Sequence, residues 1–322
     1  MPSTVHSPER NAATSAIRTS SQISDGVRQT PNTMRTEVVL AADGTPLSVH
    51  THGASGPTVL LTNGIGTTSN FWRFLIAELT TDHTVVHWDY RGHGQTPLSA
   101  SGDYALRTHA DDLARVTRRV MERDGQAPVH VAFSMGVAVL LELYRNQPAL
   151  VRAMGLIAGA PDAPGTGTAL FRIPGTLAAL RAAVALSTPV VPLAAPLVKA
   201  FLRSKLPYPL ARMAGVIQPG ASRHDIDEFL AGVAAMDPLA YWLTLRGLLG
   251  ARGSDVLPSV SVPTLIIAAA KDQLMPVAQL EAMRRGLPNA RFVLIENAGH
   301  AGLVEKGPEM AAAVRGLLRS VR

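Results

Sequence analysis

A serine, an aspartate and a histidine each follow a different apolar run, and together these residue types can activate a hydroxyl group as a nucleophile. Ser134 follows the run VHVAF, Asp272 follows PTLIIAAA, and His300 follows RFVLIEN. A serine hydroxyl attacks poorly until a base accepts its proton, and the base needs a third group to orient it. The chain order nucleophile, acid, base therefore predicts Ser134 as nucleophile, Asp272 as acid and His300 as base.

The residues around Ser134 predict a sharp turn between a strand and a helix. Ser134 stands in the sequence AFSMG, with Ala132 two residues before it and Gly136 two residues after it. Such small side chains let the chain turn within two residues, so that the serine Oγ is exposed beside the N-terminus of the next helix. Taken alone, the motif also fits an ordinary serine at a strand-to-helix turn.

Acyl transfer also needs two hydrogen-bond donors for the oxyanion of a tetrahedral intermediate. The backbone N–H of Met135, directly after the nucleophile, is one predicted donor. The second is the N–H of Ile65 in the sequence NGIG, where two glycines permit unusual backbone angles. Phe71 and Trp72 follow this loop, and we expect both to line the substrate pocket.

One alternative for the acid lies in the sequence GAPDAPG. Asp162 in this segment follows the apolar run at 153–159, so it also lies at the end of a predicted strand. Asp272 is the preferred acid, and Asp162 is kept as the second candidate.

Apolar runs and helical patterns alternate along the chain. Two alternating runs around Asp43-Gly44 predict a hairpin, and six short apolar runs predict buried strands at 57–62, 83–89, 129–133, 153–159, 263–270 and 291–297. Helical patterns separate most of these runs, at 71–79, 109–122, 137–144, 277–285 and 308–320. The alternation predicts an α/β fold with a doubly wound, mostly parallel sheet of eight strands. Ligands bind at the carboxyl ends of the strands in such sheets, which is where the three candidate residues stand.

Composition narrows the choice of partner and cofactor. The 322 residues are 47% hydrophobic and 17% charged, which suffices for a sizeable core. The net charge is +6, but no block of like charges is present, so we expect no nucleic-acid partner. The chain has no cysteine, and His50 and His52 alternate as residues of a strand surface do. We therefore predict neither a metal site nor an organic cofactor.

Residues 1–35 differ from the rest of the chain. They are rich in serine and threonine, poor in large apolar residues, and have no apolar stretch of the kind that a secretory signal needs. We interpret them as a disordered leader and expect a cytoplasmic protein.

Four motifs together resemble the α/β-hydrolase fold family, from about Thr36 to the C-terminus. They are NGIG, DYRGHGQTP at 89–97, AFSMG, and the pair KDQLMP and AGHAGLVEKGP. The resemblance implies a serine hydrolase that needs no metal or organic cofactor, in which His93 belongs to a structural loop. The family often has His where Asn63 stands and Gly where Ala132 stands. Ser134 excludes the relatives that use an aspartate nucleophile.

The resemblance also assigns the segment at 161–245, where the strand and helix alternation stops, to a helical cap over the active site. The core is then 36–160 and 246–322. The cap sequence has 17 uncharged residues between Arg181 and Lys199, with prolines at 189, 192 and 196 that argue against a membrane span. Two hypotheses remain for it: cap helices packed on the core, or a lid that also contacts lipid surfaces through its cations, Lys199, Arg203, Lys205 and Arg212.

The predicted function is hydrolysis of carboxylic esters that carry apolar acyl or lipid-like chains, through an acyl-enzyme on Ser134. The same triad serves thioesterases, cofactor-free perhydrolases and C–C bond hydrolases. A C–C bond hydrolase needs a basic residue for the carboxylate of its substrate, and Arg73 is the candidate. A relative that binds a ligand without catalysis is the non-enzymatic alternative, although no triad member is missing. Oligomeric state is left open by the sequence.

Overall fold

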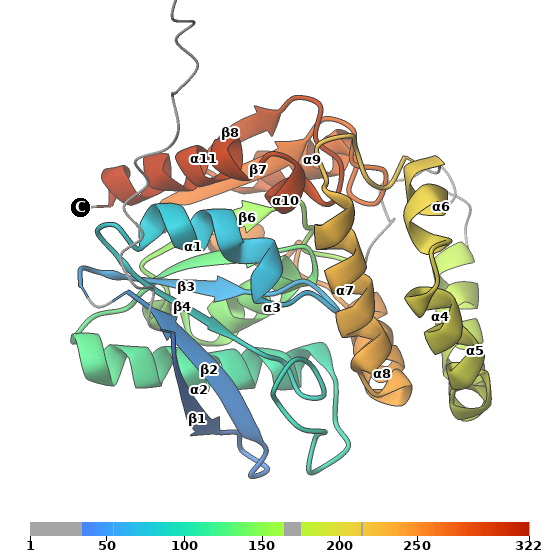
Figure 1. Ribbon diagram of the computed structural model, residues 1–322. Helices are drawn as coiled ribbons and strands as arrows, with labels where there is room; N and C mark the ends of the chain where they lie inside the picture. The colour runs from blue at the N-terminus through green and yellow to red at the C-terminus, as the bar shows by residue number, and fades with distance from the viewer. Residues whose placement is uncertain (1–33, 54, 164–174, 214, 322) are drawn as a thin grey trace, which may run out of the picture. The chain divides into compact units, whose positions relative to one another are not determined.

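The computed structural model describes residues 34–53, 55–163, 175–213 and 215–321, and within them it contains one mixed sheet of eight strands. The order across the sheet is β1-β2-β4-β3-β5-β6-β7-β8 (Figure 1). The strands are β1 Arg35–Leu40, β2 Pro46–His52, β3 Thr58–Thr62, β4 Thr84–Trp88, β5 Val129–Phe133, β6 Ala153–Ile157, β7 Thr264–Ala269 and β8 Ala290–Ile295. The predicted fold class is confirmed.

Strand direction follows from the connections. The hairpin of β1 and β2 turns at Asp43-Gly44, where Gly44 has a φ of +85° and Asp43 Oδ1 accepts the Thr45 N–H. β2 runs antiparallel to both its neighbours, and the pairs from β4 to β8 are all parallel. Every residue of β3, β4, β5 and β6 is buried, because helices cover both faces.

Two layers of helices enclose the sheet. α1 (Arg73–Leu79) packs against α11 (Gly307–Ser320) on one face, next to the short α10 (Gly302–Glu305). α2 (Leu106–Asp124) packs against α3 (Met135–Asn146) on the other face, and α9 (Val277–Gly286) joins the same apolar cluster. The predicted helical patterns fall within these helices and within the 3₁₀ helix η1 (Ser69–Trp72) ahead of α1.

In the described residues, five α-helices interrupt the alternation between β6 and β7, and they fall within the predicted insertion or run just past its end. They are α4 Thr176–Ser187, α5 Val191–Arg203, α6 Pro207–Met213, α7 Arg223–Ala235 and α8 Pro238–Leu249. Helices α7 and α8 lie next to the core, and α4, α5 and α6 lie beyond them (Figure 1). We call these five helices the cap.

The prolines of the cap coincide with changes of helix type: α4 ends at Ser187, Pro189 lies in a 3₁₀ helix, and Pro192 stands in the first turn of α5. α4, the 3₁₀ helix η4 (Thr188–Val190) and α5 follow one another directly, and Pro196 lies inside α5. The combined stretch Thr176–Arg203 has 28 residues and is long and apolar enough to cross a membrane, by length and composition alone. It is the one such stretch in the described residues.

The N-terminal segment is described only from Met34. β1 begins at Arg35, so its first residue falls inside the predicted leader at 1–35. Residues 1–33 lie outside the described part of the chain, and the leader stays a prediction.

Candidate active site

Ser134 occupies a strained turn between β5 and α3. Its backbone has φ 53° and ψ −117°, a left-handed conformation that only a few non-glycine residues of the described chain adopt. A Cβ at Gly136 would lie 2.6 Å from the carbonyl oxygen of Thr62, so only glycine fits where α3 begins against the end of β3. Gly136, two residues after Ser134, therefore permits the turn that exposes the Oγ of Ser134.

The three predicted catalytic residues meet at this turn. Ser134 Oγ lies 3.0 Å from His300 Nε2, and His300 Nδ1 lies 2.8 Å from Asp272 Oδ2. With Asp272 ionised it can only accept, so Nδ1 carries the hydrogen and Nε2 is left as the acceptor for the serine O–H. These are the contacts that a nucleophile, a base and an orienting acid require.

Asp272 is held by its own loop. Its second oxygen, Oδ1, accepts the backbone N–H groups of Leu274 and Met275 at 2.8 and 2.9 Å, and its side chain is fully buried. Asp162, the alternative acid, accepts instead from the backbone N–H of Gly253 at 2.9 Å and from Ser254. The structure therefore brings Asp272 and not Asp162 to the histidine.

The NGIG loop passes directly against the nucleophile. A Cβ at Gly64 would lie 3.1 Å from Ser134 Cβ. The Gly64 carbonyl accepts the Thr67 hydroxyl at 2.9 Å, and in a planar trans peptide the N–H of Ile65 then points to the opposite side. Met135 is the first residue of α3, so its N–H has no acceptor within the helix. Both predicted donors lie beside Ser134 in sequence or in space, and their role stays a prediction.

Asn63 anchors this loop in place of the histidine that the resemblance leads us to expect. Its Oδ1 accepts the indole N–H of Trp72 at 2.6 Å, and its Nδ2 donates to the Trp88 carbonyl at 2.9 Å. The hydroxyl of Tyr90 donates to the Asn63 carbonyl at 2.8 Å. The buried amide thus has partners on both sides, which fixes the start of the loop.

An apolar cavity of about 740 Å³ opens above Ser134 and His300. It is lined by core loops and by the cap, and among the described residues that line it there is no Asp, Glu, Lys or Arg. Phe71 lines the cavity as predicted. Trp72 does not: it is fully buried behind the wall, where its indole is bonded to Asn63 and its ring packs edge-on against Phe133. The prediction that Trp72 lines the pocket is therefore wrong.

Sequence reasoning missed the cap residues that form about half of the wall. Ile226, Phe229 and Leu230 of α7 line the cavity, as do Phe201 and Leu202 at the end of α5. The spacing of 226, 229 and 230 is that of one helix face, and this pattern could have identified α7 as an amphipathic helix facing the site.

Glu305 is another residue to which the sequence pattern assigns no role. Its carboxylate is buried and accepts the backbone N–H of Gly299, next to His300, and that of Gln218, at 2.7 Å, between α6 and α7. Burial raises the pKa of Glu305 above its usual value. One carboxylate thus ties the histidine loop to the cap, which a sequence pattern cannot reveal because the partners are far apart along the chain.

Arg73 does not serve the cavity. Both of its terminal nitrogens bond the carboxylate of Asp225 at the start of α7, and Arg73 is absent from the lining residues. The candidate for binding a substrate carboxylate is therefore occupied by a structural ion pair between core and cap.

His93, His50 and His87 occupy structural positions. His93 is buried, contacts the Arg91 carbonyl through Nδ1 at 3.0 Å, and its pKa is lowered to about 4 by burial. His50 faces Asp89 at 3.2 Å, and the ring of His87 stacks on His50 with ring centres 4.6 Å apart. Nitrogen or oxygen atoms of His50, His87 and Asp89 lie within 4.8 Å of one another. The rings of His50 and His87 are stacked in nearly parallel planes, so their nitrogen lone pairs do not point to a common position. We therefore interpret this group as side chains packed on the sheet.

Comparisons with known proteins identify the family of the chain. The sequence pattern of the alpha/beta hydrolase fold family matches residues 57–307. The chain belongs to this family. A relative named "Putative carbamate hydrolase RutD", from Pseudomonas savastanoi pv. phaseolicola, is 29% identical over 254 residues, which cover 77% of this hydrolase and 88% of the relative.

Solved structures show the same fold. A thermophilic esterase from Thermogutta terrifontis has a TM-score of 0.69 and 22% identity, covering 89% of this hydrolase and 99% of the esterase. A hydrolase from Pseudomonas aeruginosa PA01 has a TM-score of 0.70 and 21% identity, with 88% and 98% covered. At this level of identity the likeness concerns the architecture, and the substrate must be argued from the site.

Proposed function

We propose that this hydrolase cleaves neutral carboxylic esters with apolar acyl chains, using Ser134, His300 and Asp272. The observation that carries the proposal is the uncharged, apolar cavity of about 740 Å³ that contains Ser134 and His300 in its wall. Apolar pockets with few polar groups at one end bind apolar chains and orient one reactive group. The polar end here is a serine within hydrogen-bond reach of a histidine.

Acylation begins when Ser134 Oγ attacks the ester carbonyl and its proton passes to His300 Nε2. The carbonyl oxygen becomes an oxyanion, which the N–H groups of Ile65 and Met135 stabilise. The intermediate collapses as the bond to the alcohol oxygen breaks, and His300 gives its proton to that oxygen. Asp272 stabilises the imidazolium that exists between these two transfers.

Deacylation repeats the sequence with water. His300 accepts a proton from a water molecule, whose oxygen attacks the acyl carbonyl. The second intermediate collapses with cleavage of the bond to Ser134 Oγ, which regains a proton from His300. The products are one carboxylic acid and one alcohol, and no metal or organic cofactor takes part.

The cavity lining favours esters over the alternatives that share the triad. A substrate of a C–C bond hydrolase carries a carboxylate, and burying that charge without a cation is costly. The one candidate cation, Arg73, is paired with Asp225. A carbamate ester has the same reactive carbonyl, and the name of the relative makes aryl carbamates worth testing.

The first experiment measures intact mass after incubation with a fluorophosphonate, together with hydrolysis of p-nitrophenyl esters from acetate to palmitate and of an aryl carbamate. We expect one adduct on Ser134 and an optimum at a medium or long acyl chain. Ser134→Ala should form no adduct and lose a factor on the order of 10⁵ to 10⁶ in kcat, with an unchanged circular dichroism spectrum.

Each other outcome points to a different function. An adduct without turnover of any oxygen ester would move the proposal to thioesters or to peracid chemistry. Absence of the adduct would mean that Ser134 is not activated, and would favour a relative that binds a ligand without catalysis.

A further inference from the structure

The outer face of the cap carries an unusual concentration of exposed apolar side chains. Ten of the sixteen large hydrophobic residues that are exposed in the described chain lie between residues 180 and 213. Leu193 and Leu197 on α5 are 79% and 77% exposed, and Met213 at the end of α6 is 84% exposed. Contiguous exposed apolar surface of this kind marks an interaction site.

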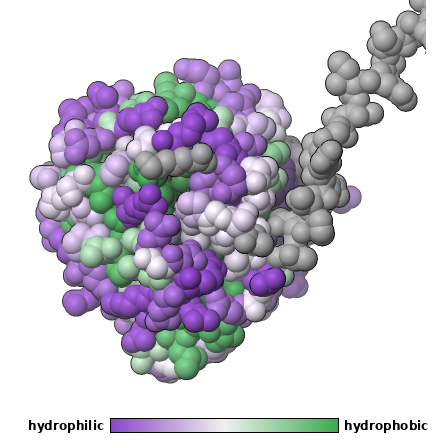
Figure 2. All heavy atoms as spheres, turned by 90° about the vertical axis from the view of Figure 1, so that its left-hand side faces the viewer, coloured by the Kyte–Doolittle hydropathy of each residue, from purple (hydrophilic) through white to green (hydrophobic). Residues whose placement is uncertain are grey.

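The exposed residues form a stripe along the stretch of α4, η4 and α5. Leu186, Val190, Leu193 and Leu197 follow one another at intervals of four, three and four residues, which places them on one side of a helix. No residue of α5 is classed as buried, and only Val184 is buried in α4. In contrast, hydrophilic side chains separate small apolar patches on the face seen in Figure 2, on the side of the molecule away from these helices.

The inner side of the same helices is already occupied. α5 packs against α7 and α8, and its residues Phe201 and Leu202 line the cavity. In α4, Arg181 donates to the Leu249 carbonyl at 2.7 Å, and the Val184 carbonyl accepts the indole N–H of Trp242 at 3.0 Å. A helix that spans a bilayer has lipid or other spanning helices all round it, so these contacts fit a stretch that lies on a surface.

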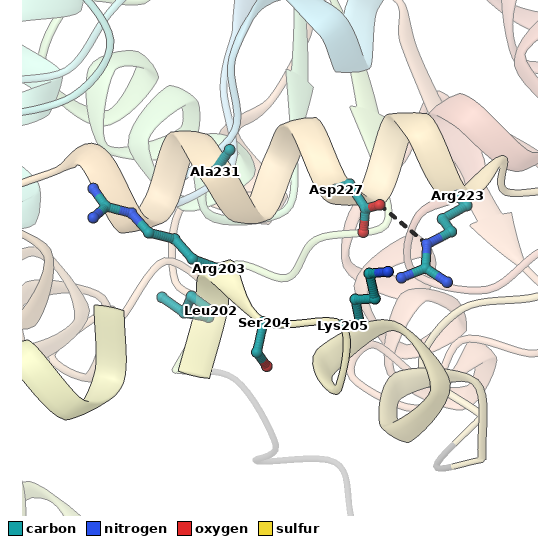
Figure 3. A pocket seen from close by; sticks show the side chains of 7 residues that line it. All are labelled: Leu202, Arg203, Ser204, Lys205, Arg223, Asp227 and Ala231. Carbon is teal, nitrogen blue, oxygen red and sulfur yellow. Dashed lines mark hydrogen bonds and ion pairs between the residues drawn. The ribbon is translucent and has the colours of Figure 1, made fainter. Parts of the chain in front are cut away.

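The charges of the cap's outer helices are all of one sign. The sequence from Ala163 to Ser222 contains no Asp or Glu, and the described part of it carries the cations Arg181, Lys199, Arg203, Lys205 and Arg212. Figure 3 shows where α5 ends against α7: the side chains of Lys205 and Arg223 point toward Asp227, and that of Arg203 points the other way along α7. Asp227 is the one acid beside these three cations among the residues of the groove.

We propose that the outer face of α4, α5 and α6 binds the surface of a bilayer that contains anionic lipid. The leucine stripe enters the interface between headgroups and acyl chains, while Lys199, Arg203, Lys205 and Arg212 contact lipid phosphates. Each such cation strengthens binding about five-fold near an anionic surface. The cavity and the membrane-binding face share one wall, because Phe201 and Leu210 line the cavity and are also partly exposed.

The test is flotation of the whole chain with vesicles of phosphatidylcholine mixed with phosphatidylglycerol, and with vesicles of phosphatidylcholine alone. We expect binding to the mixed vesicles, at least about ten-fold weaker binding to the neutral ones, and weakening by salt. Leu193→Ser with Leu197→Ser should reduce binding ten-fold or more. A matched control, Val38→Ser with Leu40→Ser, changes residues of β1 that are 59% and 60% exposed, and should leave binding unchanged.

A second pair separates charge from apolar contact. Lys199→Gln with Lys205→Gln should lower binding to mixed vesicles about twenty-five-fold, while Arg107→Gln with Arg115→Gln, on the exposed side of α2, should change it little. Equal binding by all variants, or binding to neither vesicle, overturns the proposal. So does a dimer in light scattering that the leucine variant abolishes when no vesicle is bound, because the face would then be a contact between two copies. None of these results depends on the proposed esterase activity.

Discussion

The core and the cap bury their apolar residues in opposite ways. In the core, every residue of β3 through β6 is buried, and both layers of helices pack onto the sheet. In α4 and α5, 25 residues contribute one buried side chain. A dense core holds side chains in single rotamers, whereas helices with few buried contacts open at low free-energy cost.

Because of this difference, we assign different roles to the core and the cap at the candidate active site. Ser134, Asp272 and His300 all follow strands of the buried sheet, so their mutual distances are set by packing that a substrate cannot alter. Helices α5, α6, α7 and α8 of the cap supply about half of the residues that line the cavity. We therefore expect changes in the core to alter the rate for all substrates, and changes in the cap to alter the choice of substrate.

The largest effect that tests the division comes from the acid. Asp272→Asn keeps the shape of the side chain but no longer holds His300 in the tautomer that accepts the serine proton, so kcat should fall about 10⁴-fold for every ester. Asp162→Asn, the matched control, should leave kcat within about three-fold. If the two variants had equal activity, Asp272 would not be the acid. Stopped-flow or steady-state assays with p-nitrophenyl acetate and octanoate measure both.

A change in the cap should instead discriminate between chain lengths. Leu230→Trp adds bulk to the cavity wall, so kcat/KM for p-nitrophenyl palmitate should fall about thirty-fold while that for acetate changes less than about three-fold. Leu98→Trp, at an exposed position outside the cavity lining, is the control. An equal loss for both esters would contradict the division of roles.

The junction of core and cap should give an intermediate effect. Glu305→Gln leaves one oxygen for two backbone N–H groups, so one of the bonds to Gly299 and Gln218 is lost. An unsatisfied buried donor costs about 1–3 kcal/mol, and a displaced His300 loop should lower kcat about ten-fold. Glu309→Gln, half exposed on α11, should change neither the free energy of unfolding nor kcat noticeably. Thermal unfolding and ester assays on the same samples check this.

The smallest predicted effect concerns the core alone and depends on pH. His109 is fully buried against Tyr90, and burial lowers its pKa to about 3. Its pKa in the unfolded chain is near 6.5. The contribution of the neutral, buried His109 to the free energy of unfolding is therefore fully present above about pH 6.5. It is lost as the pH falls toward 3, by up to about 1.4 kcal/mol per pH unit. In His109→Phe, the loss of unfolding free energy between pH 6.5 and 4.5 should be smaller than in the parent protein by about 2 kcal/mol.

Urea unfolding at several pH values measures how steeply the free energy of unfolding changes with pH, which we call the pH slope. His224→Gln removes a histidine whose side chain is 87% exposed, and it should leave the pH slope as it is. A parallel curve for His109→Phe and the parent protein would show that His109 is protonated in the folded state.

Local sequence patterns were sufficient for the strands and for the turn at Ser134. A run such as VHVAF can only be buried on both faces, and an alternation of such runs with helices leaves few topologies other than a doubly wound sheet. The turn at AFSMG could also be predicted from the local sequence, because Gly136 has no side chain; in the structure this leaves room for the backbone of Thr62 and Asn63. The sequence by itself therefore determined the fold class and the turn at Ser134, and it predicted which residues form the triad.

Contacts between distant segments were decided only by the tertiary structure. The sequence ranked Asp272 above Asp162 but could not show the contact, which exists because the loop of Asp272 reaches His300 and that of Asp162 reaches Gly253. Trp72 and Phe71 are neighbours, yet a bond to Asn63 turns the indole into the core. Similarly, the apolar residues of α5 could face a cavity, a core or solvent, and hydrophobicity alone does not say which. Each of these outcomes depends on which groups meet across the fold, and loop-to-loop distances are set by the packing of the whole molecule.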